Sequence, residues 1–552
     1  MTKRFGASVH WKSRKRLSCF RLAVLGGVAA LLSVSAASTA AQAMEIDTGN
    51  PDIRVQWTNT FKYSTAFRVG KISNDVTANI NADDGDRAFK QWKPISNRVD
   101  WLSELNITNA SQTFGGRVSF AAWYDTIYNK SNYNNSASTY NQPPGSPADR
   151  FTNDTERLMG RKIDLLDAFV FGRGDLFGHF ASFRLGRHTL MWGESLLIPY
   201  NGIAHGQAPL DAIKAAAVPS STAKELFMPV TQASGSFQIM PGLNLAAYYQ
   251  FEWRETRLPA SGSYFSPTDN LGAGASRVFL SPGFAISRGG DIEGSDSGQY
   301  GVSLRWTPED SDYTFGLYAI RYNEKTPTAY INLNAAFTPT SYQLVYPDDV
   351  KAYGASVSTT ILDANVAMEG SIRQDTPLVS LGSTVLPGVT ADNDNNALYP
   401  TGNSAHLQAS VIAVLPQPAL WDTSTLQAEV AADHLIEVKK NAVNYDSSGR
   451  TRNAGTLAAI FTPTYFGVFP GLDLDVPITV HYNFAGKSSI SANMTEGSSD
   501  VSVGLNATYD TVWRAGLSYT HYMGDDPGLS DPTLGQALKD RDFISFNIQR
   551  SF

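Results

Sequence analysis

The chain has 552 residues and a net charge of −7, and aromatic residues make up 11% of it. An acidic chain is a poor partner for nucleic acid, so we expect no nucleic-acid-binding function. The only cysteine, Cys19, lies near the N-terminus, so the rest of the chain has no thiol for a disulfide, a metal site or catalysis.

Residues 1–43 are predicted to be a secretory signal peptide. They carry seven basic residues and no acidic one, then an apolar run over Leu22–Val34, and end at the cleavage pattern Ala41-Gln42-Ala43. The apolar run is too short for a membrane-spanning helix. Cleavage would remove the seven basic side chains, which lowers the net charge from −7 to −14. Residues 44–552 show no linker, and we expect them to form a single domain.

The remaining chain divides into segments in which apolar and polar residues alternate, as they do in β-strands. Short turns and long loops alternate between these segments, which is typical of outer-membrane barrels. The predicted strands are Ile53–Val69, Asn97–Thr108, Arg117–Tyr124, Ile163–Phe171, His179–Arg187, Thr231–Ile239, Leu243–Arg254, Tyr300–Trp306, Tyr313–Tyr322, Tyr353–Ile361, Ala364–Ile372, Ala405–Leu415, Thr425–Val438, Thr456–Phe466, Leu472–Phe484, Val501–Tyr509, Val512–Met523 and Phe543–Phe552.

We therefore predict an all-β transmembrane antiparallel barrel of about 18 strands, with 16–18 as the plausible range. An even number places both termini on the periplasmic side, in the bacterial outer membrane. A β-propeller or a β-sandwich also has many short strands, but its loop lengths need not alternate, and no repeat of 20 to 50 residues supports a propeller.

The segment Leu243–Arg254 illustrates the expected wall chemistry. The face predicted to meet lipid consists of Leu243, Leu245, Ala247, Tyr249, Phe251 and Trp253. The face predicted to line the lumen includes Asn244, Tyr248, Gln250, Glu252 and Arg254. An arginine on the lipid face near the midplane would cost about 2–4 kcal/mol, so the charges determine the orientation of the strand.

The last segment alternates in the same way and ends on an aromatic residue, Phe552. Such an ending resembles the signal read by the barrel-assembly machinery of Gram-negative bacteria, which we expect to be a partner through Phe552. Arg550 departs from the pattern, since the third position from the end is usually apolar. The alternative is a soluble edge strand that ends in Phe.

Between residues 187 and 232 the strand pattern stops. Ala212–Val218 is predicted to be a short helix, and Thr222-Ala223-Lys224-Glu225 is a capping box that opens another. Long loops with their own secondary structure are usually functional. One interpretation is a constriction folded into the lumen, and the other is a solvated extracellular loop held by salt bridges. The predicted solute-contacting residues are Arg187, Trp192, Glu194, Asn201, Gln207, Asp211, Lys224 and Glu225.

Four stretches together resemble the domain-of-unknown-function 1302 family of Gram-negative bacteria. They are Ser96–Leu105, Trp192-Gly193-Glu194-Ser195, Gln207-Ala208-Pro209-Leu210-Asp211, and Phe251-Glu252-Trp253 with Gly262–Ser266. The resemblance covers nearly the whole exported chain. It implies an outer-membrane location and, loosely, genes concerned with hydrophobic compounds, lipids or steroid-like molecules. It supplies no catalytic residues.

Enzyme and metal motifs are weak in this sequence, so we predict no catalytic residues, no metal and no cofactor. Ser221–Lys224 matches S-x-x-K, but its companion motifs are absent. No histidine lies in a hydrolase-like motif, although a triad assembled in space would leave no local pattern. The acidic runs Asp83–Asp86 and Asp392–Asn396 offer oxygen ligands for calcium but lack the distal Glu of a full loop, so we expect acidic turns.

The sequence thus predicts an outer-membrane channel for passive passage of small hydrophobic, aromatic or amphipathic solutes. One alternative is a plugged barrel that docks onto a periplasmic or export-system partner, and another is an outer-membrane hydrolase. The expected partners of the channel are outer-membrane lipid, the assembly machinery and the solute.

Overall fold

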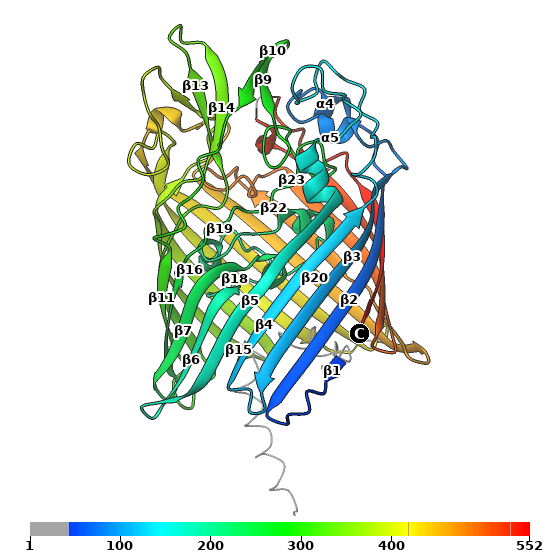
Figure 1. Cartoon of the computed structure of the whole chain (residues 1–552), viewed down its shortest axis with the longest axis vertical. Coiled ribbons are helices and arrows are strands. Elements are labelled where there is room, and N and C mark those ends of the chain that lie inside the picture. Colours follow the sequence, from blue (N-terminus) through cyan, green and yellow to red (C-terminus); the bar gives the residue numbers. More distant parts are fainter. Residues whose placement is uncertain (1–43, 418, 530) are drawn as a thin grey trace, which may run out of the picture.

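The computed structural model describes residues 44–417, 419–529 and 531–552, so the predicted signal peptide lies outside the described residues. The chain forms a closed antiparallel β-barrel with loops rising from one end (Figure 1). Its sheet has 20 strands, of which β1 (Met44–Ile46) is a short addition to β2, while β21 and β22 are two halves of one wall strand. That leaves eighteen wall strands, and the predicted number is confirmed.

The eighteen strands follow one another around the wall in sequence order. They are β2 (Ile53–Arg68), β3 (Pro94–Asn109), β4 (Phe114–Asp125), β5 (Arg161–Leu176), β6 (His179–His188), β7 (Val230–Met240), β8 (Leu243–Gln250), β11 (Tyr300–Trp306), β12 (Thr314–Tyr322), β15 (Val350–Ile361), β16 (Ala364–Pro377), β18 (Thr401–Leu415), β19 (Thr423–Lys440), β20 (Asn453–Phe469), β21 (Leu472–Asp475) with β22 (Ile478–Ala485), β23 (Ser498–Tyr509), β24 (Trp513–Gly524) and β25 (Phe543–Ser551).

The barrel closes where β25 pairs with β2, with Thr60 opposite Ser551 and Arg68 opposite Phe543. Arg550, the residue that departs from the usual ending, points to the outside of this seam. Its guanidinium lies 5.1 Å from the ring centre of Trp513 and 4.5 Å from that of Phe552. The cation is therefore held by aromatic faces at the rim of the barrel, where its charge can remain hydrated.

The outer surface of the barrel is apolar, and exposed aromatic residues gather at both ends of the strands. Near the loop end they are Tyr63, Tyr124, Tyr249, Tyr300, Tyr353, Tyr482 and Tyr519. Near the turn end they are Phe114, Phe180, Trp306, Phe315, Phe469, Tyr509 and Trp513. Exposed aliphatic residues such as Leu317, Met368 and Val503 lie between them. Two aromatic girdles around an apolar band mark a barrel that spans the bacterial outer membrane. Among the described residues, no helix is long and apolar enough to cross a membrane.

Two of the short turns have positive φ at both central residues. The hairpin loop between Ile361 and Ala364 has two residues, and the loop between Tyr509 and Trp513 has three. Leu362 and Asp363 have φ of 48° and 67°, and Asp510 and Thr511 have φ of 47° and 60°. Positive φ at both central residues is the mark of a type I′ turn, whose twist matches that of the flanking strands. The backbone is strained at these two turns, because leucine and threonine rarely adopt positive φ.

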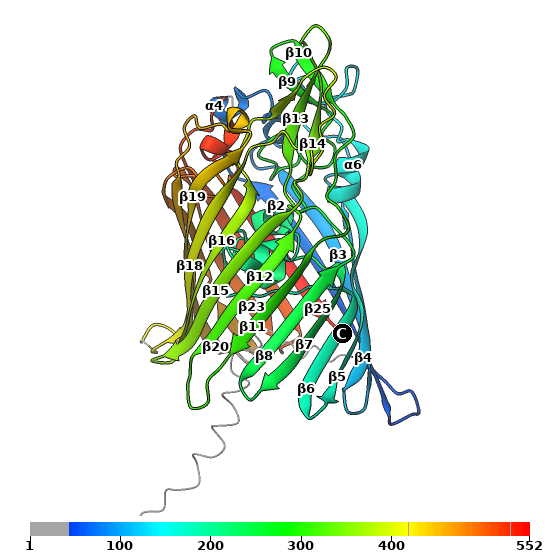
Figure 2. The same ribbon diagram turned by 90° about the vertical axis from the view of Figure 1, so that its left-hand side faces the viewer.

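The loop end contains structure that the sequence did not predict. The long segments after β8 and β12 were expected to be loops, but they carry β9 (Arg277–Ser281), β10 (Phe284–Arg288), β13 (Thr328–Leu333) and β14 (Pro339–Val345). With β17 (Ser383–Val385) these strands form a separate sheet in the order β17-β13-β14-β10-β9. Figure 2 shows this sheet standing above the barrel mouth. Short strands flanked by Pro, Asn and Gly gave too weak an alternation to be recognised.

The helices of the described chain are short and lie in the connections at the loop end. They are α4 (Asn74–Thr77), α5 (Asp84–Arg87), α6 (Asn153–Thr155), the π-helix η1 (Glu156–Gly160), the 3₁₀-helix η2 (Ile203–Gly206), α7 (Ala212–Ala217), α8 (Ala223–Leu226), and the 3₁₀-helices η3 (Ala442–Asn444) and η4 (Pro532–Leu534). Several of the outer loops share a buried core that includes Phe89, Tyr128, Phe151, Tyr264 and Phe543. The loops therefore form a folded cover over part of the mouth.

Candidate functional site

The connection between β6 and β7, residues 189–229, folds into the barrel and carries η2, α7 and α8 (Figures 1 and 2). We call this segment the inner loop. Side chains that point inward from the wall strands β8, β16, β18 and β19 bond to its backbone or to its polar side chains. Of the two interpretations of this segment, the structure therefore supports the loop folded into the lumen.

Glu429, an inward residue of β19, makes the densest of these attachments. Its carboxylate accepts the backbone N–H groups of Leu196 at 3.2 Å and of Leu197 and Ile198 at 2.6 Å each. Glu429 is buried, and so are the three residues that donate to it. A carboxylate that receives three N–H groups has its charge compensated without a basic partner.

A second attachment comes from β16, where Glu369 and Arg373 both point inward. Glu369 accepts the N–H groups of Glu194 at 2.7 Å and of Ile203 at 2.6 Å. Arg373 donates to the carbonyl groups of Asn201 at 2.6 Å and of Gly202 at 2.9 Å. The same stretch of backbone is thus bonded through its N–H groups to an anion and through its carbonyl groups to a cation.

Glycine is required where the inner loop passes Glu369. A Cβ on Gly193, whose φ is +84°, would lie 2.0 Å from the Oε2 of Glu369. A Cβ on Gly202 would lie 1.9 Å from the hydroxyl of Ser195. A side chain at either place would displace these hydrogen-bonded groups, and the positive φ of Gly193 gives Trp192-Gly193-Glu194-Ser195 a physical reason for its second residue.

A third attachment is a hydrogen-bonded row of three side chains on β18 and the inner loop. The Nε2 of His406 lies 2.9 Å from the hydroxyl of Ser404, and its Nδ1 lies 2.9 Å from the Oδ1 of Asn201. Serine, histidine and an amide in this order have the connectivity of a hydrolase triad. Ser404 is completely buried, however, so no substrate reaches its hydroxyl. The row holds Asn201 in place.

Trp192 and Gln207 fasten the inner loop to the wall at β8 and β12. The Trp192 ring packs against Tyr248, with ring centres 5.0 Å apart, and against Tyr318 at 6.4 Å. The Gln207 side chain accepts the Trp192 N–H at 2.6 Å, and the Gln207 carbonyl accepts from the side chain of Gln250. Trp192 is only 9% exposed, so its ring supports the inner loop more than it offers a free face.

The second half of the inner loop reaches the other side of the lumen. Asp211 caps α7 by accepting the Lys214 N–H, and its carboxylate lies 2.6 Å from Arg257. Arg257 also pairs with Asp164, an inward residue of β5. Ile213, Ala216 and Ala217 pack against a buried cluster that includes Ala66 of β2. With one half fixed to β16–β19 and the other beside β2 and β5, the inner loop crosses the lumen.

The remaining predicted residues do not gather around Trp192. Arg187 forms an ion pair with Glu252 at 3.2 Å, and Glu252 lies beyond β8, which ends at Gln250 and is shorter than predicted. Arg254, also beyond β8, pairs with Asp164 at 3.1 Å. Lys224 and Glu225 are exposed on α8, where Glu225 completes the predicted capping box with Thr222.

Glu194 of the inner loop lies beside a partly exposed cation of the lumen wall. Its carboxylate accepts from Ser356 at 3.4 Å and lies 3.7 Å from Arg305, whose side chain is 43% exposed. Arg305 was not among the predicted residues, nor were Glu369, Arg373, His406 and Glu429. All of them lie inside a predicted strand except Arg373, which directly follows the predicted strand Ala364–Ile372. A charged residue in the middle of a barrel strand has to face the lumen, which is the signal that would have identified most of them.

Solved structures with a likeness to this chain are barrels of low sequence identity. OccAB3 of Acinetobacter baumannii is 10% identical, with 90% of this chain and 99% of that chain covered and a TM-score of 0.44. OpdK of Pseudomonas aeruginosa, in a structure with vanillate, is 9% identical, with 90% and 98% covered and a TM-score of 0.41. A BenF-like porin of Pseudomonas fluorescens Pf-5 is 9% identical, with 91% and 98% covered and a TM-score of 0.41.

No curated protein matches the chain. A family model described as "Protein of unknown function (DUF1302)" matches residues 24–552, which is nearly the whole sequence and includes all four stretches that carry the resemblance. The chain is therefore a member of the DUF1302 family.

Proposed function

We propose that this protein is an outer-membrane channel through which small amphipathic, hydrophobic or aromatic solutes pass by diffusion, and that the inner loop sets the width and selectivity of the passage. The observation that carries this proposal is the attachment of the inner loop across the lumen of an eighteen-strand barrel. A barrel of this size encloses an aqueous channel unless loops fill it.

The polar groups that a solute would meet have both signs of charge. Glu194 and Arg305 form a partly exposed pair beside the inner loop, and Arg117 on β4 pairs with Asp167 on β5 at 3.0 Å on the lumen wall. Paired charges of opposite sign leave little net field in the passage. Such a lining disfavours selection of a simple ion and suits a solute with both polar and apolar surfaces.

The proposal is tested by liposome swelling with the purified protein. Vesicles that contain the protein are moved into isotonic solutions of an aromatic carboxylate, a short fatty acid and a sugar of similar size. A channel of the proposed kind admits the aromatic and amphipathic solutes faster than the sugar. Equal rates for all three would reject the selectivity, and no swelling with any solute would reject the channel.

A plugged barrel that docks a partner is the second candidate, and the folded cover over part of the mouth favours it. Shortening the inner loop between residues 204 and 222 separates the two. A channel then admits the sugar faster, because its constriction is wider. A barrel that is closed by its outer loops stays impermeable.

A further inference from the structure

Away from the lumen, three outer loops meet beside α5 at the mouth of the barrel (Figure 1). The first outer loop, residues 69–93, carries Asp83 and Asp84, and the fourth outer loop, residues 251–299, carries Asp269. The second outer loop, residues 126–160, contributes Asn134 and Asn141, which donate to the two carboxylate oxygens of Asp84 at 2.9 Å each.

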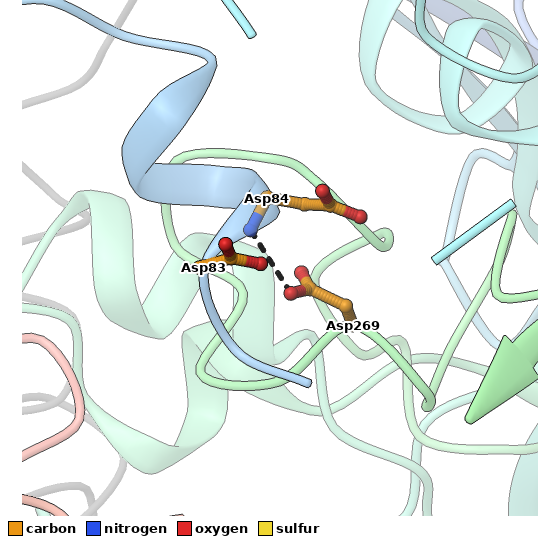
Figure 3. Close-up of side chains that lie close together, drawn as sticks. All are labelled: Asp83, Asp84 and Asp269. Atoms are coloured by element: carbon orange, nitrogen blue, oxygen red, sulfur yellow. Dashed lines mark hydrogen bonds between the residues drawn. The ribbon is translucent and has the colours of Figure 1, made fainter. Parts of the chain in front are cut away.

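The three carboxylates are buried against one another. Asp83, Asp84 and Asp269 are 0%, 1% and 0% exposed, and one oxygen of each lies within 4.8 Å of the other two. Figure 3 shows the carboxylates of Asp83 and Asp269 pointing toward each other, while the Asp84 N–H donates to the Oδ2 of Asp269 at 3.0 Å.

Two of the oxygens in this group have no partner. The Oδ1 of Asp83 and the Oδ1 of Asp269 are buried and receive no hydrogen bond. A buried polar atom without a partner destabilises the fold, and more so when it carries charge. Two neutral oxygens nearby are in the same condition, namely the side-chain carbonyl of Asn141 and the hydroxyl of Ser263, both buried.

The three carboxylates also have few basic partners. Arg87 pairs with Asp83, but the third acid of the run, Asp86, pairs with Arg68 at 3.0 Å and Arg541 at 2.9 Å. Of the three carboxylates, Asp83 alone has an arginine within ion-pair distance among the described residues.

We infer that Asp83, Asp84 and Asp269 bind a calcium ion that joins the first and fourth outer loops over the barrel mouth. Calcium takes six to eight oxygen ligands in flexible geometry, and carboxylates, amide oxygens and hydroxyls are the ligands it prefers. A divalent cation would also supply positive charge to Asp84 and Asp269, which have no arginine within ion-pair distance in the described part of the chain. The sequence marked Asp83–Asp86 as possible oxygen ligands but could not reveal Asp269, which lies 185 residues from Asp84.

The site is tested with terbium as a calcium substitute, added to the detergent-solubilised full-length barrel after treatment with a chelator. Tyr140 shares a small cavity with Asp84 and should sensitise the luminescence of the bound ion. We expect one saturable terbium site, displaced by calcium at about 0.1–1 mM, the range of extracellular calcium modules. Calcium should also raise the thermal midpoint of unfolding.

The informative variant is Asp269→Asn, which keeps the shape of the side chain and removes the charge. It should bind terbium and calcium at least tenfold more weakly and lose the calcium-dependent rise in midpoint. The matched control is Asp394→Asn in the exposed acidic turn, where the Asp392 side chain already accepts the N–H groups of Asp394 and Asn396. This control should bind as the wild type does.

Absence of terbium and calcium binding by the wild-type barrel would overturn the inference, as would unchanged binding by Asp269→Asn. Folding of each variant is checked by its heat-dependent shift in gel mobility. If Asp269→Asn does not fold, the wild-type titration and Asp84→Asn decide the question by the same criteria.

Discussion

Replacement of Glu429 by alanine isolates the strongest attachment of the inner loop. The change removes the acceptor of three buried N–H groups, those of Leu196, Leu197 and Ile198. A hydrogen bond to a charged group contributes about 1.5–3 kcal/mol, but bonds to one carboxylate are not independent. We take about 3 kcal/mol for the set, which corresponds to about a hundredfold increase in the population with this stretch detached.

Hydrogen–deuterium exchange measures that population directly. Peptides that cover residues 194–203 should exchange about a hundredfold faster in Glu429→Ala, while peptides from the wall strands should keep their rates. The control is Glu437→Ala on the same strand, where the side chain is exposed and bonds to Asn403. If Glu429→Ala leaves the exchange of residues 194–203 unchanged, the carboxylate does not hold the inner loop, and our description of the attachment is wrong.

Three further predictions concern the buried row on β18, one turn and the outer loops. Ser404→Ala should lower the free energy of unfolding by about 0.5–1.5 kcal/mol, measured by thermal unfolding. It should leave any ester hydrolysis by the purified barrel unchanged. Hydrolysis that disappears in this variant would instead make Ser404 a nucleophile. Thr511→Gly should raise the thermal midpoint by relieving the positive φ of the Asp510-Thr511 turn, worth about 0.5–1 kcal/mol, and a lower midpoint would show that the turn is not strained. Without divalent cations, the midpoint should fall as pH rises from about 4 to about 8, because Asp269 and Asp540 have pKa values raised to about 7 and the unfolded chain loses these protons first. Asp269→Asn should reduce this change of the midpoint with pH, and calcium should abolish most of it. If the midpoint of the variant depends on pH as that of the wild type does, Asp269 does not titrate in this range.

The wall of the barrel was predictable from sequence because lipid imposes one rule on every strand. Each predicted strand has its counterpart, and the orientation of Tyr248 and Gln250 toward the lumen follows from alternation alone. The outer sheet was missed, since strands in water at the mouth are not held to that rule. Its short strands gain their stability from packing such as that of Tyr342 and Ile286, which local sequence does not reveal.

The extent and helices of the inner loop were predictable from sequence, but its position inside the barrel was not. Its helices, the capping box at Thr222 and its polar residues are local features. Its position depends on Glu369 and Glu429, whose pairing with backbone N–H groups joins residues more than 160 positions apart. Ion pairs that form across the lumen in this way leave no local pattern in the sequence. We therefore expected Arg187 and Lys224 beside Glu194, whereas the cation beside Glu194 is Arg305 and Arg187 pairs with Glu252.

The central claim is that water fills a passage beside the inner loop, and single-channel recording in planar bilayers tests it most directly. Wild-type protein should give discrete, steady current steps, and protein with the inner loop shortened between residues 204 and 222 should give larger ones. A wild-type barrel that carries no current, or steps of the same size with and without the intact inner loop, would contradict the claim.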